Sequence, residues 1–428
     1  MKENIEVGAL ARVEGEGGLY IGLTDGAVTE VRLDIYEPPR FFEGFLIERF
    51  LQEVPDITAR ICGICPVAYQ MSSVYALESI LGIQVSPQVR LLRRLLYCGE
   101  YIESHALHIY LLQAPDLLGK ESALELAEIA PEVVKNALRL KKIGNEILKA
   151  IGGRSVHPVN VCVGGFYRWP EAAPLQALLP DLEWGLEAAR ECVRWAKDLP
   201  YPDLEVDYEF VALHHPEEYG VIEGEVWSSN GRKTPVSEFE KAYLETHVRH
   251  SNALHSYTVE GTPYLVGPMA RLNLNHAQLH AEAQKALKES GLVLPLRNPY
   301  KSLIARAIEL VHFYAEAIEH IRDYRPQGPA HATLKLKAGE GAAATEAPRG
   351  LLYHRYAINK QGRIQRARIV PPTAQNLPRI EADLFALAPK LVKMEQAEAT
   401  LTAEHLVRSY DPCISCATHF LKLKIEHK

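Results

Sequence analysis

The sequence of 428 residues lacks a long apolar run and an excess of positive charge. No segment approaches the uncharged stretch of about 18 residues that a membrane-spanning helix needs, and the N-terminus has no apolar stretch long enough for a signal peptide. The 47 lysines and arginines are outnumbered by 54 aspartates and glutamates, and the net charge of −7 argues against a surface for nucleic acid. Hydrophobic residues at 47% and charged residues at 24% are typical of globular proteins. We therefore expect a folded, cytoplasmic protein without membrane insertion and without a nucleic-acid partner.

Cysteine is also scarce, and the seven residues in the chain are too few for a disulfide scaffold. Four of them form two C-x-x-C pairs at opposite ends of the chain, Cys62 with Cys65 and Cys413 with Cys416. Two thiolates separated by two residues can hold one ion, and two such pairs can complete a four-sulfur site. A structural zinc ion is one interpretation, although the pairs of a zinc ribbon normally lie about 15–20 residues apart. The remaining cysteines are isolated and are expected to pack as small hydrophobes: Cys98, Cys162 and Cys192.

Apolar residues at steps of three and four predict helices over much of the chain. The predicted helices cover residues 41–53, 91–112, 120–151, 172–198, 277–290 and 301–324. Hairpins are expected at 18–35 and within 353–370, and a small α+β excursion at about 200–275. Several helices are long enough to lie side by side as a bundle, so the predicted fold class is mainly α with small α+β portions.

Further motifs occur in order around the cysteine pairs. They are Arg12-Val-Glu14-Gly, Arg40-Phe-Phe-Glu43, Gly152-Gly-Arg-Ser-Val-His157-Pro, Glu346-Ala-Pro348-Arg349-Gly and Pro371-Pro372-Thr373-Ala-Gln-Asn376. Together with the flanks of the cysteine pairs, they resemble the large, catalytic subunit of nickel-iron hydrogenases, in that family's order. The resemblance covers essentially the whole chain. It implies a single hydrogenase large-subunit domain over residues 1–428, built on a central bundle of long helices.

The resemblance implies a nickel ion bound by four thiolates. The ligands would be Cys62, Cys65, Cys413 and Cys416. Cys65 and Cys416 would also bridge to an iron ion that carries one carbonyl and two cyanides, and soft sulfur suits nickel. Three further residues match the segments that line these diatomic ligands, where a hydroxyl can donate to a partly negative cyanide: Pro348, Pro372 and Thr373.

One position departs from the family. Where the family usually has a histidine four residues after the second cysteine, this chain has Tyr69. A tyrosine keeps a hydrogen-bond donor for a neighbouring thiolate but offers no imidazole that titrates.

Glu14 and Arg349 match the family's residues for proton transfer and for polarising dihydrogen. Splitting dihydrogen into a hydride and a proton needs a base, here the sulfur of Cys413, and Glu14 would pass the proton outward. Arg349 would be held by two carboxylates, Asp116 and Asp411, because a planar guanidinium suits bidentate pairing. Whether Arg349 is the base or a polariser stays open. A purely structural ion pair of Arg349 and a merely solvated Glu14 are the alternatives.

Glu43 and His419 match the ligands of a third metal, which is magnesium in most relatives and iron in some. A backbone carbonyl between residues 367 and 375 would complete the site with water. Carboxylate and water favour magnesium, whereas imidazole favours iron. Residues 420–428 match a tail that a maturation endopeptidase removes after nickel chaperones have supplied the metal, and a short retained tail is the alternative.

We predict the dihydrogen-activating subunit of a cytoplasmic hydrogenase coupled to NAD(P), of the soluble, bidirectional, sulfhydrogenase-like branch. No G-x-G-x-x-G follows a strand, so NAD(P) and flavin would bind to diaphorase partner subunits. An iron-sulfur small subunit would carry electrons, since no cysteines remain in a cluster pattern. The alternatives are the equivalent chain of a deazaflavin- or heterodisulfide-linked hydrogenase, a regulatory dihydrogen sensor, and a connecting protein related to respiratory complex I, which the four cysteines disfavour.

Overall fold

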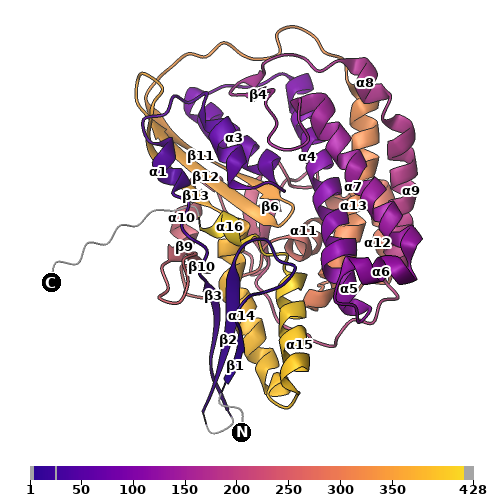
Figure 1. Cartoon of the computed structure of the whole chain (residues 1–428). Coiled ribbons are helices and arrows are strands. Elements are labelled where there is room, and N and C mark those ends of the chain that lie inside the picture. Colours follow the sequence, from indigo (N-terminus) through magenta and orange to yellow (C-terminus); the bar gives the residue numbers. More distant parts are fainter. Residues whose placement is uncertain (1–3, 25–26, 419–428) are drawn as a thin grey trace, which may run out of the picture.

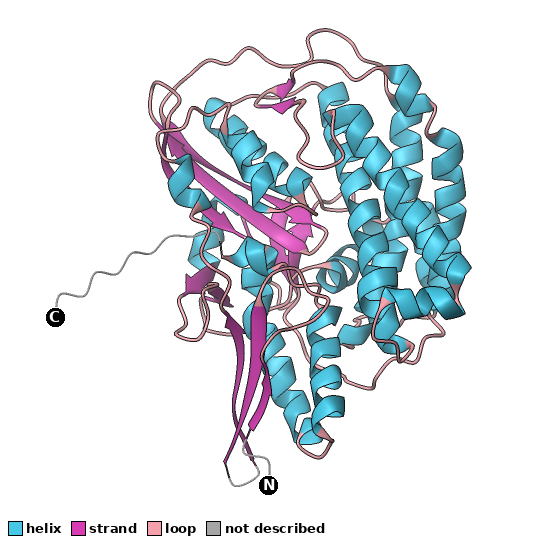
Figure 2. Cartoon of the chain, viewed as in Figure 1, coloured by secondary structure: helices cyan, strands magenta, loops and turns pink. Residues whose placement is uncertain are grey.

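Helices make up about half of the structure, a computed structural model that describes residues 4–24 and 27–418 (Figures 1 and 2). The α-helices are α1 (Phe42–Leu46), α2 (Val54–Thr58), α3 (Pro66–Leu81), α4 (Pro87–Leu107), α5 (Ala114–Leu117), α6 (Ala123–Ile129), α7 (Pro131–Gly152), α8 (Ala172–Gln176), α9 (Leu179–Ala196), α10 (Phe239–Ala242), α11 (Pro268–Asn275), α12 (Ala281–Ser290), α13 (Ser302–Asp323), α14 (Pro372–Leu391), α15 (Gln396–Ser409) and α16 (Ile414–Ala417). Tighter or wider helical turns are η1 (Ala59–Ile61), η2 (a π-helix, His108–Gln113), η3 (Val236–Glu238), η4 (His276–Gln278) and η5 (Pro299–Lys301). Among these described helices, none has the length and low charge that crossing a membrane requires.

The strands form several small antiparallel sheets. They are β1 (Asn4–Val7), β2 (Gly17–Thr24), β3 (Ala27–Ile35), β4 (Val161–Cys162), β5 (Gly165–Phe166), β6 (Val211–His214), β7 (Glu225–Ser228), β8 (Lys233–Thr234), β9 (Tyr243–Thr246), β10 (His255–Thr258), β11 (Gly339–Ala347), β12 (Gly350–Ile358) and β13 (Ile364–Val370). The sheet orders are β1-β2-β3, β6-β7-β8 and β11-β12-β13, while β4 pairs with β5 and β9 with β10. The predicted fold class, mainly α with small β portions, is confirmed.

The bundle consists of α4, α7, α9 and α13, which pack against one another and run side by side in Figure 1. Their facing residues are apolar at helical spacing, as the sequence predicts, and polar contacts tie the helices together. Tyr314 of α13 donates to the carbonyl oxygen of Leu140 in α7 at 3.1 Å. Lys141 of α7 pairs with Glu103 of α4 at 2.9 Å. The bundle thus gives a rigid support beside the sheet of β11–β13.

The sheet of β11–β13 packs against α3, the helix that follows the first cysteine pair (Figure 1). Ala347 at the end of β11 pairs with Gly350 at the start of β12, so Pro348 and Arg349 form a two-residue turn between the strands. A two-residue hairpin turn fixes its backbone tightly. Arg349 is therefore presented from a strand end rather than from a long loop.

Sequence patterns do not predict β11, because its sequence is rich in glycine and alanine and carries no alternating apolar pattern. The small residues are needed because α3 lies close to this strand. A Cβ added at Gly341 would lie 2.3 Å from the Ser79 hydroxyl oxygen and 2.7 Å from an Ile80 side-chain carbon. Close packing on α3 thus restricts β11 to small side chains, and the alternating apolar pattern of a strand is absent from its sequence.

The predicted helix over residues 41–53 is wrong as one continuous element. α1 ends at Leu46, Ile47 is extended and Glu48 adopts a positive φ of 64°. The Glu48 N–H donates to the carbonyl oxygen of Ile364, and the Ile364 N–H donates back to the carbonyl oxygen of Arg49. Pairing with the start of β13 thus replaces the helical hydrogen bonds that the apolar periodicity predicted.

The N-terminal hairpin is confirmed, with β2 and β3 on either side of residues 25–26, which lie outside the described part of the chain. It packs beside α14, whose first turn reaches the cysteine region (Figure 1). The segment at 200–275 contains β6–β10, α10 and α11. A second cluster of buried apolar side chains joins this segment to β12, with the rings of Phe239 and Tyr353 4.5 Å apart.

Candidate metal centre

The two cysteine pairs meet in the interior although they come from opposite ends of the chain. Cys62 follows η1, and Cys65 caps α3, in which Pro66 is the first residue, as the sequence predicts. Cys413 precedes the short helix α16, and Cys416 lies within it. All four side chains are buried, at 3% exposure or less.

The sulfur atoms lie close enough to share one ion. Cys62 Sγ and Cys413 Sγ are 3.7 Å apart, and the sulfurs of Cys62, Cys413 and Cys416 lie within 4.8 Å of one another. The Cys65 thiol interacts with the other three thiols. Metal–thiolate bonds of about 2.3 Å place neighbouring sulfurs about 3.8 Å apart in a tetrahedral set. The donor set therefore fits a metal that four sulfurs hold.

The thiols differ in how readily they lose a proton. Burial works against ionisation of Cys62, yet hydrogen bonding with the Cys413 and Cys416 thiols and the charge of Arg349 lower its pKa well below the ordinary value. The N–H groups of Ile64 and Cys65 also donate to Cys62 Sγ, at 3.4 and 3.2 Å. Burial raises the pKa of Cys413 well above the ordinary thiol value. Metal binding to this set consequently releases protons.

Glu14 lies against the sulfur of the second pair. Its Oε2 accepts a hydrogen bond from Cys413 Sγ at 3.0 Å and from the Ser415 N–H at 3.1 Å. The Ile414 N–H donates to the Glu14 carbonyl oxygen at 2.9 Å, so the backbones are paired as well. Gly15 permits this approach, because a Cβ there would lie 2.7 Å from Ile414 Cβ and its φ is +91°. Glu14 is half-buried, which places one carboxylate between a buried sulfur and the surface.

Arg349 is buried, and among the described residues Asp411 alone holds its guanidinium by hydrogen bonds. Its Nε donates to the carbonyl oxygen of Asp411 and its Nη2 to the Asp411 carboxylate, both at 2.9 Å. Burial disfavours the charge, but Asp411 and the thiols of Cys413 and Cys65 raise the pKa of Arg349 well above its usual value. Nη1 is buried without an acceptor among the described residues. Such an orphaned donor beside the sulfurs fits a group that binds in this space.

The predicted contact between Asp116 and Arg349 is corrected by the structure. Asp116 accepts from Arg408 Nε and Nη2 at 2.7 and 2.8 Å, and it also pairs with Arg12. Because two guanidinium groups occupy both carboxylate oxygens, Asp116 has no place at Arg349. The sequence could not distinguish these arginines, since Asp116 lies far along the chain from all of them.

Two further predicted residues surround the sulfurs. The Cys413 N–H donates to the Thr373 hydroxyl at 2.9 Å, which leaves the hydroxyl hydrogen of Thr373 free to donate elsewhere. The Tyr69 hydroxyl is buried without a hydrogen-bond partner among the described residues. Burial and the nearby cysteines raise the pKa of Tyr69 well above its ordinary value, so the group stays a neutral donor. Pro372 begins α14 next to Thr373, and Pro348 precedes Arg349.

Arg40 joins the two cysteine segments, a role that its motif did not reveal. Its Nη2 donates to the carbonyl oxygen of Ile61 at 2.7 Å and also to the carbonyl oxygen of Ser415. One guanidinium thus bridges the residue before Cys62 and the residue before Cys416. No spacing rule along the chain predicts such a bridge.

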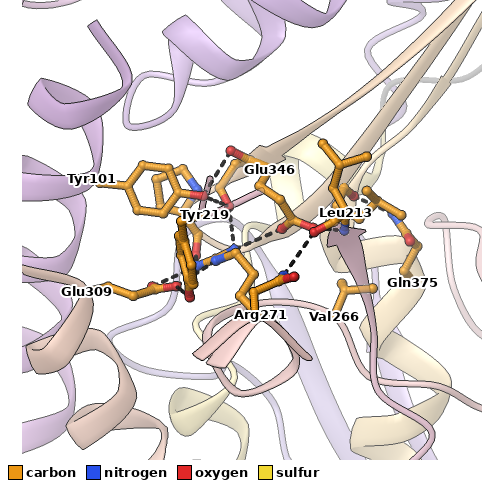
Figure 3. Close-up of polar contacts among 12 residues, drawn as sticks. Tyr101, Leu213, Tyr219, Val266, Arg271, Glu309, Glu346 and Gln375 are labelled. Carbon is orange, nitrogen blue, oxygen red and sulfur yellow. Dashed lines mark hydrogen bonds and ion pairs between the residues drawn. The ribbon is translucent and has the colours of Figure 1, made fainter. Parts of the chain in front are cut away.

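A buried ionic network supports the turn that carries Arg349 (Figure 3). Arg271 of α11 donates to Glu309 at 2.7 and 2.9 Å and to Glu346 at 3.0 Å. It also donates to the carbonyl oxygens of Ala347 and Pro348, both at 2.9 Å. Burial raises the pKa of Glu346 to about 7, while Arg271 opposes that shift. Sequence reasoning missed Arg271, because no local motif marks it.

The predicted third-metal ligands are only partly described. Glu43 accepts a hydrogen bond from the Ile369 N–H at 2.8 Å, which places its carboxylate in the 367–375 region where the carbonyl ligand is expected. His419 and the tail at 420–428 lie outside the described residues. The three isolated cysteines are buried, as predicted: Cys98, Cys162 and Cys192.

Comparison with known proteins agrees with this geometry. A family model described as nickel-dependent hydrogenase matches residues 40–137 and 222–419, which is more than half of the chain. The chain belongs to the nickel-dependent hydrogenase family. As a hydrogenase large subunit, it is a nickel- and iron-dependent oxidoreductase that acts on dihydrogen.

Relatives within the nickel-dependent hydrogenases cover nearly the whole chain. The alpha subunit of sulfhydrogenase 1 from Pyrococcus furiosus is 34% identical over 98% of each chain. The corresponding chain of the F420-non-reducing hydrogenase from Methanothermobacter marburgensis is 31% identical over 96% of this chain and 93% of that one. The structure of an NAD+-reducing [NiFe]-hydrogenase in the dihydrogen-reduced state matches 98% of this chain and 100% of that chain, with a TM-score of 0.86 and 26% identity.

Proposed function

We propose that the chain activates dihydrogen at a nickel-iron centre bound by Cys62, Cys65, Cys413 and Cys416. The observation that carries the proposal is the convergence of four buried sulfurs beside Glu14 and Arg349. Cys65 and Cys416 are the residues we assign to the iron as well as to nickel. When bound, the metal pair supplies the chemistry that splits dihydrogen into a hydride and a proton. A lone structural zinc does not account for the arginine and the carboxylate at the same sulfurs.

Glu14 moves protons in this proposal. Its Oε2 lies 3.0 Å from Cys413 Sγ, which is within reach for transfer of a proton from the sulfur. Because Glu14 is half-buried, the other side of the carboxylate can pass the proton to water. The Ser415 N–H fixes the carboxylate in that position. We therefore assign to Cys413 the base and to Glu14 the relay.

Arg349 orients and polarises dihydrogen in this proposal. Asp411 holds one side of the guanidinium with two hydrogen bonds, so Nη1 keeps a fixed direction. Arg349 stays protonated because its pKa is raised, and a protonated guanidinium is an electrostatic partner rather than a base. Asp116 does not contact Arg349 and acts indirectly, by holding Arg12 and Arg408.

The donors around the sulfurs match a carbonyl and two cyanides on the iron. Arg349 Nη1, the Tyr69 hydroxyl and the Thr373 hydroxyl can each donate to a ligand with partial negative charge. Pro348 and Pro372 add apolar surface that excludes water. A third metal, magnesium or iron, is proposed for Glu43 with His419, and removal of residues 420–428 by an endopeptidase after nickel delivery completes the proposal.

Electron transfer requires partner subunits. The cysteines outside the pairs are single and buried, so the described residues offer no iron-sulfur ligands. Exposed apolar side chains flank Arg40 in the sequence, at Tyr36, Phe45 and Ile47, and support docking of an iron-sulfur small subunit at this segment. We expect an interface on the order of 2,000 Å² or more.

The proposed complex is cytoplasmic, with flavin and NAD(P) on diaphorase subunits. Similarity to the NAD+-reducing enzyme supports this acceptor. A heterodisulfide-type acceptor is the alternative, because the relatives also include an F420-non-reducing enzyme and are therefore not limited to the NAD-reducing type. Assay of the purified complex with NAD+, NADP+ and a heterodisulfide separates the two. Reduction of neither nicotinamide would contradict the first proposal.

Metal analysis tests the centre itself. The chain is produced with its maturation proteins, and nickel and iron are measured together with infrared bands of carbonyl and cyanide. We expect bands of both ligands and one iron per nickel if the third metal is magnesium, or two if it is iron, whereas Cys413→Ser should lose nickel. Zinc alone at these cysteines in active protein would contradict the proposal. Without a small subunit, the chain should exchange dihydrogen isotopes but not sustain reduction of a dye.

A further inference from the structure

A second group of metal-ligating side chains lies outside the cysteine centre. It consists of His250, His255 and Glu381, whose ligand atoms all lie within 4.8 Å of one another. His250 belongs to the connection between β9 and β10, His255 begins β10, and Glu381 lies in the middle of α14. Two imidazoles and a carboxylate are a donor set that zinc and other divalent first-row metals bind.

The distances within the group suit one small ion. His250 Nε2 lies 2.9 Å from Glu381 Oε1, and His255 Nε2 lies 3.4 Å from Glu381 Oε2. A tetrahedral zinc ion with bonds of about 2.0–2.1 Å keeps its ligand atoms about 3.3 Å apart. The two rings are 5.5 Å apart and nearly perpendicular, at 82°, so they approach the carboxylate from different directions.

The environment of the His255 imidazole distinguishes this group from an ordinary ion pair. The His255 side chain is fully buried, Nδ1 has no hydrogen-bond partner among the described residues, and Nε2 contacts only Glu381 Oε2, at 3.4 Å and without hydrogen-bond geometry. Buried polar groups are nearly always bonded, and an imidazole without a donor or acceptor is costly. An ion between His255 Nε2 and Glu381 would satisfy the nitrogen.

The charge of Glu381 is also available to an ion. Within the described residues, the ion pairs of Glu381 involve histidines alone, and the Leu33 N–H donates to its Oε1 at 2.8 Å. Arg32, the neighbour of Leu33 on β3, is already paired with Glu30 and Asp34. The half-buried Glu316 makes a useful contrast: it also faces two histidines, but Arg94 already pairs with it at 2.7 Å.

We propose that His250, His255 and Glu381 bind a zinc ion, with water in the fourth position. Water can reach the site because the Glu381 and His250 side chains are partly exposed, at 15% and 23%. The ion would fasten the β9–β10 pair to α14. The same helix presents Thr373 to the Cys413 N–H, so the ion stabilises one wall of the cysteine centre from outside.

Zinc titration of the full-length, metal-loaded protein tests the site. The protein is treated with a chelator, and Zn²⁺ affinity is measured by competition with a chromophoric chelator. Cobalt then replaces zinc, because a histidine–carboxylate site lacks the thiolate-to-cobalt charge-transfer band that binding at the cysteines would give. We expect tight binding without that band, and a higher midpoint of thermal unfolding when zinc is added.

Variants decide between an ion site and a plain ion pair. Glu381→Gln keeps an oxygen for the Leu33 N–H, and His255→Asn keeps a polar side chain; each should weaken Zn²⁺ binding by more than about 100-fold, since loss of an outer-shell partner alone costs about 10–100-fold. His320→Asn, from the Glu316 group, is the matched control and should bind zinc normally. Absence of zinc binding in the parent protein, or unchanged affinity in both variants, would overturn the proposal and leave a histidine–carboxylate ion pair.

Discussion

The network around Arg271 predicts that activity depends on a residue that touches no sulfur. We consider Arg271→Lys, which keeps the charge but replaces a planar fork with a single ammonium. Arg271 makes five hydrogen bonds, three to carboxylates and two to the carbonyl oxygens of Ala347 and Pro348. An ammonium has three donors at one point, so at least two of these bonds are lost.

The size of the stability loss follows from the acceptors of Arg271 that the variant leaves without a hydrogen bond. Each lost bond of this charged kind costs about 1.5–3 kcal/mol, so the variant should lose about 3–6 kcal/mol of stability. Full removal of the cation, as in Arg271→Met, should cost more, because Glu309 would remain ionised in the core with only His105 and Tyr219 as partners. The lysine variant also frees the carbonyls before Arg349, so the guanidinium should lose its fixed position.

The assay compares dihydrogen–deuterium exchange per nickel with the midpoint of thermal unfolding. Arg93→Lys is the matched control, because Arg93 is equally buried and binds Glu78, near the C-terminal end of α3, at 2.8 and 2.6 Å. We expect both variants to unfold at lower temperature and Arg271→Lys alone to lose activity per nickel. Equal activity per nickel in the two variants would refute the positioning role of Arg271.

Three more outcomes are expected. Glu14→Gln keeps size and hydrogen bonding but removes the titratable carboxylate, so proton-coupled turnover should fall by roughly 10²–10⁴-fold with metal content unchanged; full isotope exchange would exclude the relay. Arg349→Lys should lose most activity with the metals retained, because the two-bond hold by Asp411 is lost; normal turnover would make Arg349 structural. Burial lowers the pKa of His105 to about 4 and that of His108 to about 3, so the unfolded chain binds protons that the folded chain does not. Stability should therefore fall as pH drops from about 6.5 toward 4, by about 1.4 kcal/mol per pH unit for each histidine, and a denaturant midpoint that rises on acidification would contradict this.

Sequence patterns predict what is local. Helical periodicity locates α4, α9 and α13 because their buried faces repeat within each element. The capping position of Cys65 follows from Pro66, and Asp411 lies two residues before Cys413, so its proximity to the centre needs no knowledge of the fold. The reach of Glu14 to Cys413 required the family resemblance, since nothing in Arg-Val-Glu-Gly alone indicates a partner at the far end of the chain.

Partners of buried charges could not be predicted in the same way. Asp116 is expected at Arg349 from the motifs and lies at Arg12 and Arg408 instead, because three arginines compete for two carboxylates and only the packing of the chain selects the pairs. Spacing gives the residue type that a site needs. It does not give the direction in which a long side chain leaves the backbone.

The cysteine centre is therefore completed by contacts from distant parts of the chain. The segment from Cys413 to Cys416 is held by Glu14, by Arg40 and by Thr373, and all three contacts form between segments that are distant in sequence. Each such contact must offset the entropy of closing a long loop, so these contacts are stable only when the bundle and the sheets hold the chain ends together. The four sulfurs can consequently meet only in the nearly complete fold, which makes metal binding at this centre a late step that depends on residues throughout the chain.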